Sequence, residues 1–419
     1  MKRVIIEPGP GIRQGLRDLP KNINSRTIGG TLLALGFALP GMLRMATICA
    51  GAGLTEKEMV SWLFSIWFFG GLIGVVMSLR YKMPIAGAYS IPGSIMLVSV
   101  FQSFTFQQAI AGYFLAGVIV LIIGLTGSMS KLLRVLPMPI VSAMIVGMLF
   151  KYLTGIITGV TSSMPLVAIP VVLAFFLTMR FSKKIPPIVA ALVVGIIMVF
   201  VTGAITPSDV QFSFVAPRLY APSFENFGGI LLSIAVPLAI LVMGAENTQA
   251  IGVLKNEGYD PPVNAMTVVS GIGGILVAPF GGHNANIAGP MTAMCATDVS
   301  GPKEGRYAAT TMLGLVWMIV AFITSIAVTF VSSIPSAMLN LIVGLSIMSL
   351  MTSSLKNAFA GGKFKFGALI ALATGISGIS LFNISASFWA LIFGTITSLI
   401  VETKDFKEMM AEKEKAEKT

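Results

Sequence analysis

The chain has 419 residues, of which 55% are hydrophobic and only 11% charged, whereas a soluble globular domain carries about 25% charged residues. This composition excludes an ordinary soluble domain and predicts an all-α polytopic membrane protein, because the uncharged runs have the length of roughly 20 residues that a membrane-spanning helix needs. The formal net charge of +11 does not indicate nucleic-acid binding, since basic residues in membrane proteins gather in cytoplasmic loops.

The chain begins with a basic segment, residues 1–26, which holds six Lys and Arg residues and no apolar stretch of the kind found in a cleavable signal peptide. Ile12, Leu16 and Leu19 recur there at near-helical spacing among basic residues. This pattern is typical of a helix that lies on the anionic inner leaflet. A disordered basic tail is the alternative.

Apolar runs bounded by turn and charge signals predict about fourteen spans, seven in each half of the chain. A more polar, extracytoplasmic linker at 205–227 separates two repeats at 27–204 and 228–401, and a charged tail follows at 402–419. The predicted spans cover residues 27–50, 59–79, 84–101, 107–130, 136–156, 162–181 and 186–204, and then 228–251, 262–279, 282–297, 307–332, 334–354, 364–381 and 385–401.

The positions of Lys and Arg test this count, because these residues gather in cytoplasmic connections. With the N-terminus inside, 24 of the 28 fall in the two tails and in alternate connections, and the other four are Arg44, Lys57, Lys151 and Arg218. An error of one span would scramble this alternation. We therefore predict a multi-pass protein of the inner (plasma) membrane with both termini in the cytoplasm.

Two of the predicted spans are interrupted. An odd number of spans in each half makes an inverted-topology repeat, and the third span of each half carries a similar polar break: KMPIAGAYSIPG at 82–93 and PFGGHNANIAGP at 279–290. Non-helical backbone survives in a membrane only where protein buries it or where it lines a cavity. Paired breaks therefore indicate a transporter's central site, unless Pro and Gly merely kink continuous helices.

The breaks are expected to restart helices near mid-membrane, at Pro92-Gly93 and at Gly289-Pro290. Their free N–H groups and positive dipole ends would suit a carboxylate or a carbonyl-rich ring. Glu246 is the only one of the 17 acidic residues inside a predicted span. Because burial favours the protonated carboxyl, Glu246 is the predicted proton-coupling residue. A neutral Glu that bonds a neighbouring helix is the alternative.

The predicted substrate contacts lie on the two breaks and beside Glu246. They are Tyr89, Ser90, Gly93, Asn247, His283, Asn284, Asn286 and Gly289. His283, the only histidine, is alternatively a proton relay or a packing residue. Asn284 and Asn286 alternatively satisfy the interrupted backbone, and Tyr89 offers a face for a planar ring.

Arg44, late in the first span, is a candidate charge partner for Glu246 or for a substrate carboxylate, unless it extends to the membrane surface. The two cysteines, Cys49 and Cys295, have the spacing of neither a disulfide framework nor a metal site. No metal and no cofactor are expected, and neither a nucleophile motif nor a phosphate-binding loop indicates an enzyme.

At YSIPG (89–93), GYDPP (258–262) and APFGGH (278–283), the chain resembles the benzoate:proton symporter (BenE) family, and the likeness extends through most of its length. The resemblance implies the seven-plus-seven inverted fold of the related nucleobase/ascorbate transporters and sulfate permeases. In that fold, spans three and ten each contain a short strand before a half-helix. The implied core domain, which holds the substrate, comprises 27–130 and 228–332, and the implied gate domain comprises 131–204 and 333–401.

The resemblance implies a proton-coupled symporter that imports a small aromatic carboxylate such as benzoate by alternating access. A nucleobase symporter is the alternative, because Glu246 stands where the benzoate family tends to have Gln, and an acid there resembles the nucleobase branch. An anion channel is a further alternative. Expected partners are the small organic anion or planar heterocycle, protons and the lipid bilayer. A homodimer is an open alternative to a monomer.

Overall fold

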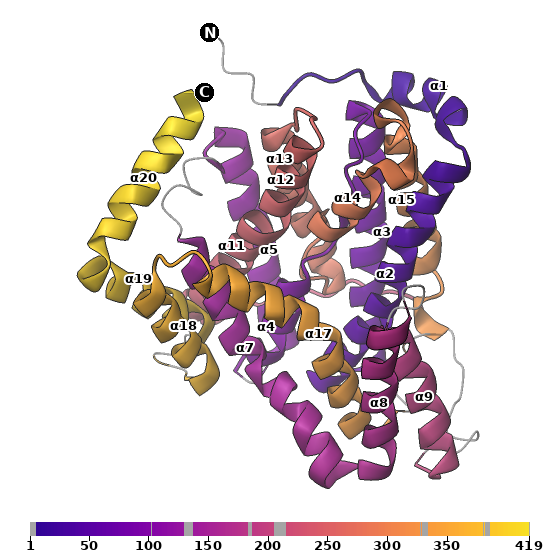
Figure 1. The fold of residues 1–419 in the computed structure, drawn as a ribbon, viewed down its shortest axis with the longest axis vertical. Helices are drawn as coiled ribbons and strands as arrows, with labels where there is room; N and C mark the ends of the chain where they lie inside the picture. The colour runs from indigo at the N-terminus through magenta and orange to yellow at the C-terminus, as the bar shows by residue number, and fades with distance from the viewer. Residues whose placement is uncertain are drawn as a thin grey trace.

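Helices make up nearly all of the regular structure in the computed structural model, which describes residues 6–101, 103–129, 137–182, 187–204, 215–326, 328, 334–379, 381 and 386–418. Figure 1 shows their arrangement. The first half contains α1 (Ile12–Asn22), α2 (Ser25–Gly51), α3 (Glu56–Tyr81), β1 (Gly87–Ala88), α4 (Ile91–Val100), α5 (Phe106–Thr126), α7 (Met138–Thr158), the π-helical turn η1 (Gly159–Ser163), α8 (Pro165–Phe181) and α9 (Pro187–Val201).

The second half begins with one long helical segment that two π-helical turns interrupt: α10 (Phe227–Ile230), η3 (Leu231–Ala235), α11 (Val236–Leu241), η4 (Val242–Asn247) and α12 (Thr248–Asn256). The following elements are α13 (Val263–Val277), the 3₁₀ turn η5 (Ala278–Phe280), β2 (Asn286–Ile287), α14 (Gly289–Cys295), the 3₁₀ turns η6 (Asp298–Ser300) and η7 (Lys303–Gly305), α15 (Tyr307–Ala321), α17 (Ser336–Phe359), α18 (Lys365–Ser377), α19 (Ala386–Val401) and α20 (Thr403–Lys418).

The prediction of an all-α chain with two broken spans is confirmed, since a two-residue strand precedes a short helix in both the third and the tenth predicted span. Within the described residues, four helical segments are long and apolar enough to cross a membrane: Glu56–Tyr81, Phe106–Thr126, Phe227–Asn256 and Val263–Phe280. The count of fourteen spans stays a prediction. Part of the predicted linker, 205–214, lies outside the described residues.

Two of the long helices begin at capping boxes. Thr55 N donates to the Glu58 carboxylate at 2.8 Å, and Glu58 N donates back to Thr55 Oγ1 at 3.4 Å. Thr105 and Gln108 make the same pair of bonds at the start of α5. Each box satisfies N–H groups that the first turn of a helix leaves without partners. The helix starts of α3 and α5 are therefore encoded locally.

The packing of the helices repeats with an offset of seven spans. In each half the second and fourth spans are α3 and α5, and α13 and α15. The second span of each half packs against the fourth span of the other: α3 against α15, and α13 against α5. Likewise α8 packs on α9 as α18 packs on α19. This reciprocity is what a pseudo-two-fold axis in the membrane plane produces.

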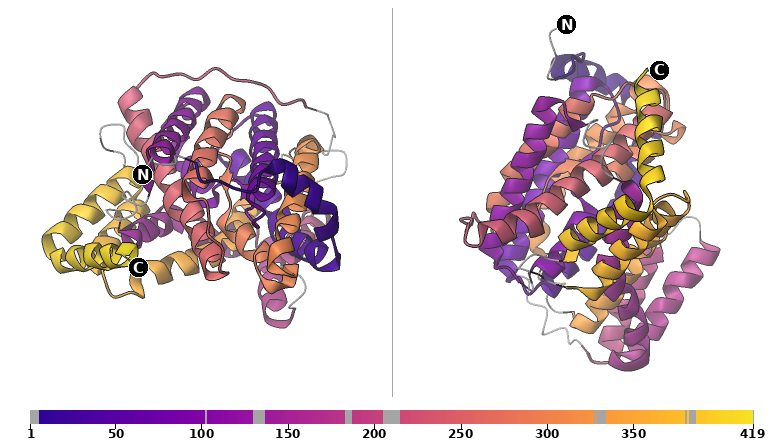
Figure 2. Two further views of the ribbon diagram at one scale, coloured as in Figure 1. Left: turned by 90° about the horizontal axis from the view of Figure 1, so that it is seen from above. Right: turned by 90° about the vertical axis from the view of Figure 1, so that its left-hand side faces the viewer.

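Two groups of helices can be followed in Figures 1 and 2. In one, α3 packs on α15 and α13 on α5, with the two strands against α3 and α13, and in the other α7 packs on α17, α18 and α19. The groups meet where α2 contacts α17 and where α4 contacts α7. The division into a core and a gate domain, with its boundaries, stays a prediction. Helix α1 and the C-terminal end of α20 both lie at the top of Figure 1.

Candidate functional site

The two strands pair with each other; α3 contacts both of them, and α13 contacts β2. They are antiparallel, with Gly87 opposite Ile287 and Ala88 opposite Asn286, and all four residues are buried. Glycines on the flanking helices let the strands approach. A Cβ on Gly70 of α3 would lie 2.7 Å from the Ala88 carbonyl oxygen. The crossing therefore depends on small residues, because side chains larger than hydrogen would push the strands away.

Each strand leads directly into a half-helix. At the start of α4, Ser90 Oγ accepts a hydrogen bond from Gly93 N at 3.1 Å, as an N-cap side chain does. At the start of α14, Gly289 and Pro290 occupy the first two helical positions, where proline loses no hydrogen bond. A Cβ on Gly289 would lie 2.6 Å from Gln249 Oε1, so α14 begins in close contact with α12.

Glu246 joins the two half-helices. Its carboxylate accepts from Ile91 N at 3.2 Å through Oε1 and from Gly289 N at 3.4 Å through Oε2, and the residue is 4% exposed. It projects from the π-helical turn η4, a feature that is frequent at functional sites. The two helix starts that sequence reasoning left free for a solute therefore hold a carboxylate from the protein itself.

Three buried asparagines on the segments that carry or contact Glu246 have incompletely used amide groups. Asn247 Oδ1 accepts from Ser270 Oγ at 3.0 Å, and Asn284 Oδ1 accepts from Ser90 N at 2.9 Å. Within the described part of the chain, the Nδ2 atoms of Asn247, Asn284 and Asn286 have no hydrogen-bond partner, nor does Asn286 Oδ1. Buried polar atoms are nearly always paired, so this cluster has donors to offer a ligand.

His283 uses both of its ring nitrogens within the protein. Trp62 Nε1 donates to Nδ1 at 2.9 Å, and Nε2 lies 3.0 Å from the carbonyl oxygen of Ser90. The residue is fully buried. Sequence reasoning missed Trp62, since nothing in an apolar span marks one indole as a hydrogen-bond donor. It also missed Ser270, which donates to Asn247 and accepts from Ile287 N at 3.3 Å.

The other predicted site residues fall into two groups. Tyr89 is buried, with its ring edge-on to His283 at a centroid distance of 6.0 Å, and a Cβ on Gly93 would lie 2.7 Å from Leu238 Cδ1. Both therefore lie at the broken segments. Arg44 lies in α2, but its side chain is outside the described residues, so its pairing with Glu246 stays a prediction.

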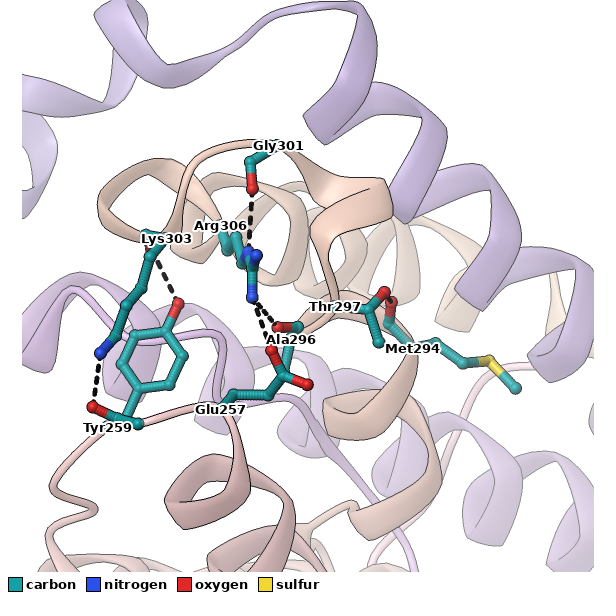
Figure 3. A network of polar contacts seen from close by, with 9 residues as sticks. Glu257, Tyr259, Met294, Ala296, Thr297, Gly301, Lys303 and Arg306 are labelled. Atoms are coloured by element: carbon teal, nitrogen blue, oxygen red, sulfur yellow. Dashed lines mark hydrogen bonds and ion pairs between the residues drawn. The ribbon is translucent and has the colours of Figure 1, made fainter.

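A polar network at one end of the molecule ties the broken tenth span to α12 (Figure 3). Arg306 Nε donates to the Gly301 carbonyl at 2.9 Å, and Nη1 donates to the Ala296 carbonyl and pairs with Glu257 Oε2 at 2.9 Å. Ala296 follows α14, and Glu257 follows α12. The guanidinium therefore links the end of α14, which begins at Gly289, to the end of α12, which follows the turn η4 that carries Glu246.

Tyr259 and Lys303 extend this network. Tyr259 Oη donates to the Lys303 carbonyl at 2.7 Å, and Lys303 Nζ lies 4.8 Å from the centre of the Tyr259 ring while donating to the Gly258 carbonyl. Burial raises the pKa of Tyr259 to about 12. The phenol therefore stays protonated and keeps its donor at any physiological pH.

The family model described as "Benzoate membrane transport protein" matches residues 22–400. The chain is 25% identical over 378 residues to the benzoate membrane transport protein of Acinetobacter baylyi, which covers 90% of this chain and 95% of that protein. It is 26% identical over 375 residues to the inner membrane protein YdcO of Escherichia coli, with 89% and 94% covered. These relatives are named as membrane proteins and not as enzymes.

Solved structures show the same fold at lower sequence identity. The transmembrane domain of the cyanobacterial bicarbonate transporter BicA matches with a TM-score of 0.64 at 16% identity, over 88% of this chain and 97% of that one. The murine Solute Carrier 26 family member A9 anion transporter, in its inward-facing state, matches with a TM-score of 0.62 at 15% identity, over 93% and 70%. These matches confirm the inverted-repeat transporter fold.

Proposed function

The chain belongs to the benzoate membrane transport family, and we propose that it is a proton-coupled symporter that imports a small aromatic carboxylate such as benzoate. Membership of the family makes it a membrane transporter of the inner membrane. The coupling ion and the substrate are the proposed part. The observation that carries them is the carboxylate of Glu246, held between the first residues of both half-helices.

Glu246 occupies the position that suits a substrate carboxylate. The N–H groups of Ile91 and Gly289 are donors in a buried setting, and the ten-residue helix α4 adds its positive dipole end. A second carboxylate beside an ionised Glu246 would be repelled strongly, because Coulomb energies rise in a low dielectric. Protonation of Glu246 removes that repulsion and frees the N–H groups. Substrate and proton therefore bind together.

The charge of the site is the same before and after the substrate and the proton bind. The empty site carries one negative charge, on Glu246. The loaded site also carries one, on the substrate, because the proton has neutralised Glu246. Both forms of the carrier cross the membrane with the same charge, so one proton per monocarboxylate gives electroneutral transport.

The unpartnered groups favour a carboxylate over a nucleobase. Among the described residues, the unpartnered amide atoms of Asn247, Asn284 and Asn286 are three donors and one acceptor, Asn286 Oδ1. They therefore offer more partners to a carboxylate than to the ring N–H groups of a nucleobase. A nucleobase would also need the oxygens of Glu246, which the backbone already holds. The ring of Tyr89, whose centroid lies 6.0 Å from that of His283, is suited to the apolar face of an aromatic acid.

Transport by this fold is proposed to follow alternating access, with the core group of helices moving against the gate group. The reciprocal packing of α3 with α15 and of α5 with α13 supports the motion of the core as one unit. The alternation of Lys and Arg along the chain supports cytoplasmic termini.

Uptake of labelled benzoate into proteoliposomes tests the proposal. An imposed pH gradient, acid outside, should drive accumulation, whereas a membrane potential without a pH gradient should not. Accumulation driven by potential alone would contradict the electroneutral scheme. Benzoate uptake that follows the membrane potential, ignores the pH gradient and does not saturate would indicate an anion channel. Saturable uptake of labelled uracil or xanthine that benzoate does not inhibit would indicate a nucleobase carrier.

A further inference from the structure

Trp62, His283 and Ser90 form a chain of hydrogen bonds from α3 to both broken segments. Because the indole Nε1 of Trp62 is a donor only, the Nδ1 atom that it contacts at 2.9 Å must accept and carries no hydrogen. The proton of the neutral ring is then on Nε2, which donates to the Ser90 carbonyl at 3.0 Å. The contacts therefore select one tautomer of His283.

The loop around His283 holds the residue before α4 by both of its backbone groups. While His283 Nε2 donates to the Ser90 carbonyl, the neighbouring Asn284 Oδ1 accepts from Ser90 N at 2.9 Å. Ser90 also caps α4 through its side chain. The next residue is Ile91, whose N–H reaches Glu246. The direction of that N–H group thus depends on how Ser90 is held.

We propose that Trp62 and His283 are positioning residues for the anion site, and that His283 does not contact the substrate. The indole of Trp62 and the carbonyl of Ser90 together fix the Nε2–H tautomer. The bond from Nε2–H to Ser90 keeps the Ile91 N–H aimed at the position shared by Glu246 and the substrate carboxylate. The expected effect on substrate affinity rests on the proposed function. The assignment of the tautomer rests only on the contacts of His283 and does not depend on the proposed function.

The single histidine of the chain makes the tautomer directly measurable. In protein labelled with ¹⁵N-histidine and reconstituted in lipid, NMR reports one imidazole. The wild type should show the neutral Nε2–H form. Trp62→Phe should shift the Nδ1 resonance to that of a nitrogen without a hydrogen-bond donor, because Nδ1 loses the indole N–H while the Ser90 carbonyl still accepts from Nε2–H. Trp67→Phe is the matched control, since Trp67 is also buried on α3 but its Nε1 has no partner among the described residues.

Two substitutions of His283 separate positioning from substrate contact. In His283→Gln the side-chain amide reaches the place of Nε2 and can still donate to the Ser90 carbonyl. In His283→Asn the side-chain oxygen reaches the place of Nδ1, so the bond from Trp62 remains and the bond to Ser90 is lost. Benzoate affinity, measured by thermal shift of the purified protein, should stay within about threefold in the first variant and fall about tenfold in the second.

The outcomes are distinguishable. A wild-type signal from an Nδ1–H ring or an imidazolium, or an unchanged signal in Trp62→Phe, would overturn the proposal. Equal losses of affinity in His283→Gln and His283→Asn would indicate that the histidine contacts the substrate. If benzoate does not bind the wild type although its histidine is the Nε2–H form, the proposed substrate is wrong and the positioning role stands.

Discussion

At the scale of residues, Glu246 determines what the site can bind. Its oxygens accept from Ile91 N and Gly289 N, so an anionic ligand has to displace the Glu246 carboxylate from these two N–H groups. Protonation of the carboxylate is the simplest way to allow this. The sequence predicted Glu246 as the proton carrier because it is the only acid in a predicted span. The position of its carboxylate could not be predicted, since it depends on contacts with two segments 43 and 155 residues away along the chain.

Glu246→Gln should abolish accumulation driven by a pH gradient, because an amide takes up no proton. Benzoate binding should remain, since a neutral side chain no longer repels the substrate. In the wild type, benzoate affinity should rise as pH falls, up to about tenfold per pH unit while Glu246 is ionised in the empty carrier. In the variant it should be independent of pH. Equilibrium binding across pH 5–9 measures both.

The exposed Glu225, near the start of α10, provides the control. Glu225→Gln should leave both accumulation and the pH dependence of binding unchanged. A Glu246→Gln carrier that still accumulates benzoate would remove Glu246 from the coupling mechanism.

At the scale of elements, close contacts of glycine place the two strands. A Cβ on Gly273 of α13 would lie 2.1 Å from the carbonyl oxygen of Ala285, and one on Gly74 of α3 would lie 2.8 Å from Gly87 N. The breaks at 82–93 and 279–290 were evident from their Pro, Gly and polar residues. The sequence did not show which helices the strands would pack against, because glycines are frequent throughout the chain, 44 in all.

Gly273→Ala should destabilise the folded protein by about 1–3 kcal/mol, because the strand backbone has to move to admit the methyl group. The matched control is Gly252→Ala on α12, where an added Cβ meets nothing within 4 Å. There alanine should stabilise the helix by about 0.5–1 kcal/mol. Thermal unfolding in detergent compares the two, and equal midpoints would contradict the tight packing of β2.

The amphipathic segment at the N-terminus is an ordered helix in the structure rather than a disordered tail. Asp18 of α1 pairs with Lys82 Nζ at 2.9 Å, just after α3. Glu7, before α1, accepts from Asn264 N and Ala265 N at the start of α13. The segment therefore connects the end of α3 to the start of α13.

The hydrogen bond from Lys82 holds the pKa of Asp18 below its ordinary value of 3.8. A group whose pKa is lower in the folded state contributes stability above its unfolded pKa and loses that contribution as pH falls further. Asp18→Asn should therefore lower the unfolding midpoint by an amount that is constant from pH 8 to 5 and shrinks below about pH 4. Asp260→Asn, at an exposed carboxyl, should have little effect at any pH.

At the scale of the whole molecule, the two helix groups are the candidate moving parts. They meet at the α2–α17 and α4–α7 contacts, and the site lies in the group that contains both strands. The Arg306 network holds the ends of α12 and α14 together, so Glu246 and Gly289 are expected to move as one body. Alternating access then requires sliding between the groups rather than within the site.

A reversible disulfide between one cysteine placed in α2 and one in α17 should stop benzoate uptake while leaving binding intact. It has to be made in a chain whose own buried Cys49 and Cys295 have been replaced by alanine. A disulfide between α18 and α19, which pack together within one group, should leave uptake unchanged. Full uptake with the α2–α17 link closed would contradict relative motion of the two groups.

The sequence by itself determined that the molecule is a polytopic membrane transporter. Long apolar runs, alternating basic loops and paired Pro/Gly breaks are local patterns, and the lipid bilayer requires the first two in any chain that spans it many times and restricts the third to buried or cavity-lining backbone. It also identified Glu246 and the Gly-Gly-His segment. Only the tertiary structure decided that Glu246 caps both half-helices, that Trp62 binds His283 and that the Nδ2 atoms of three asparagines have no partner among the described residues. These facts depend on contacts between residues far apart in the chain, and such hydrogen-bond partners produce no periodic pattern in a sequence from which they could be predicted.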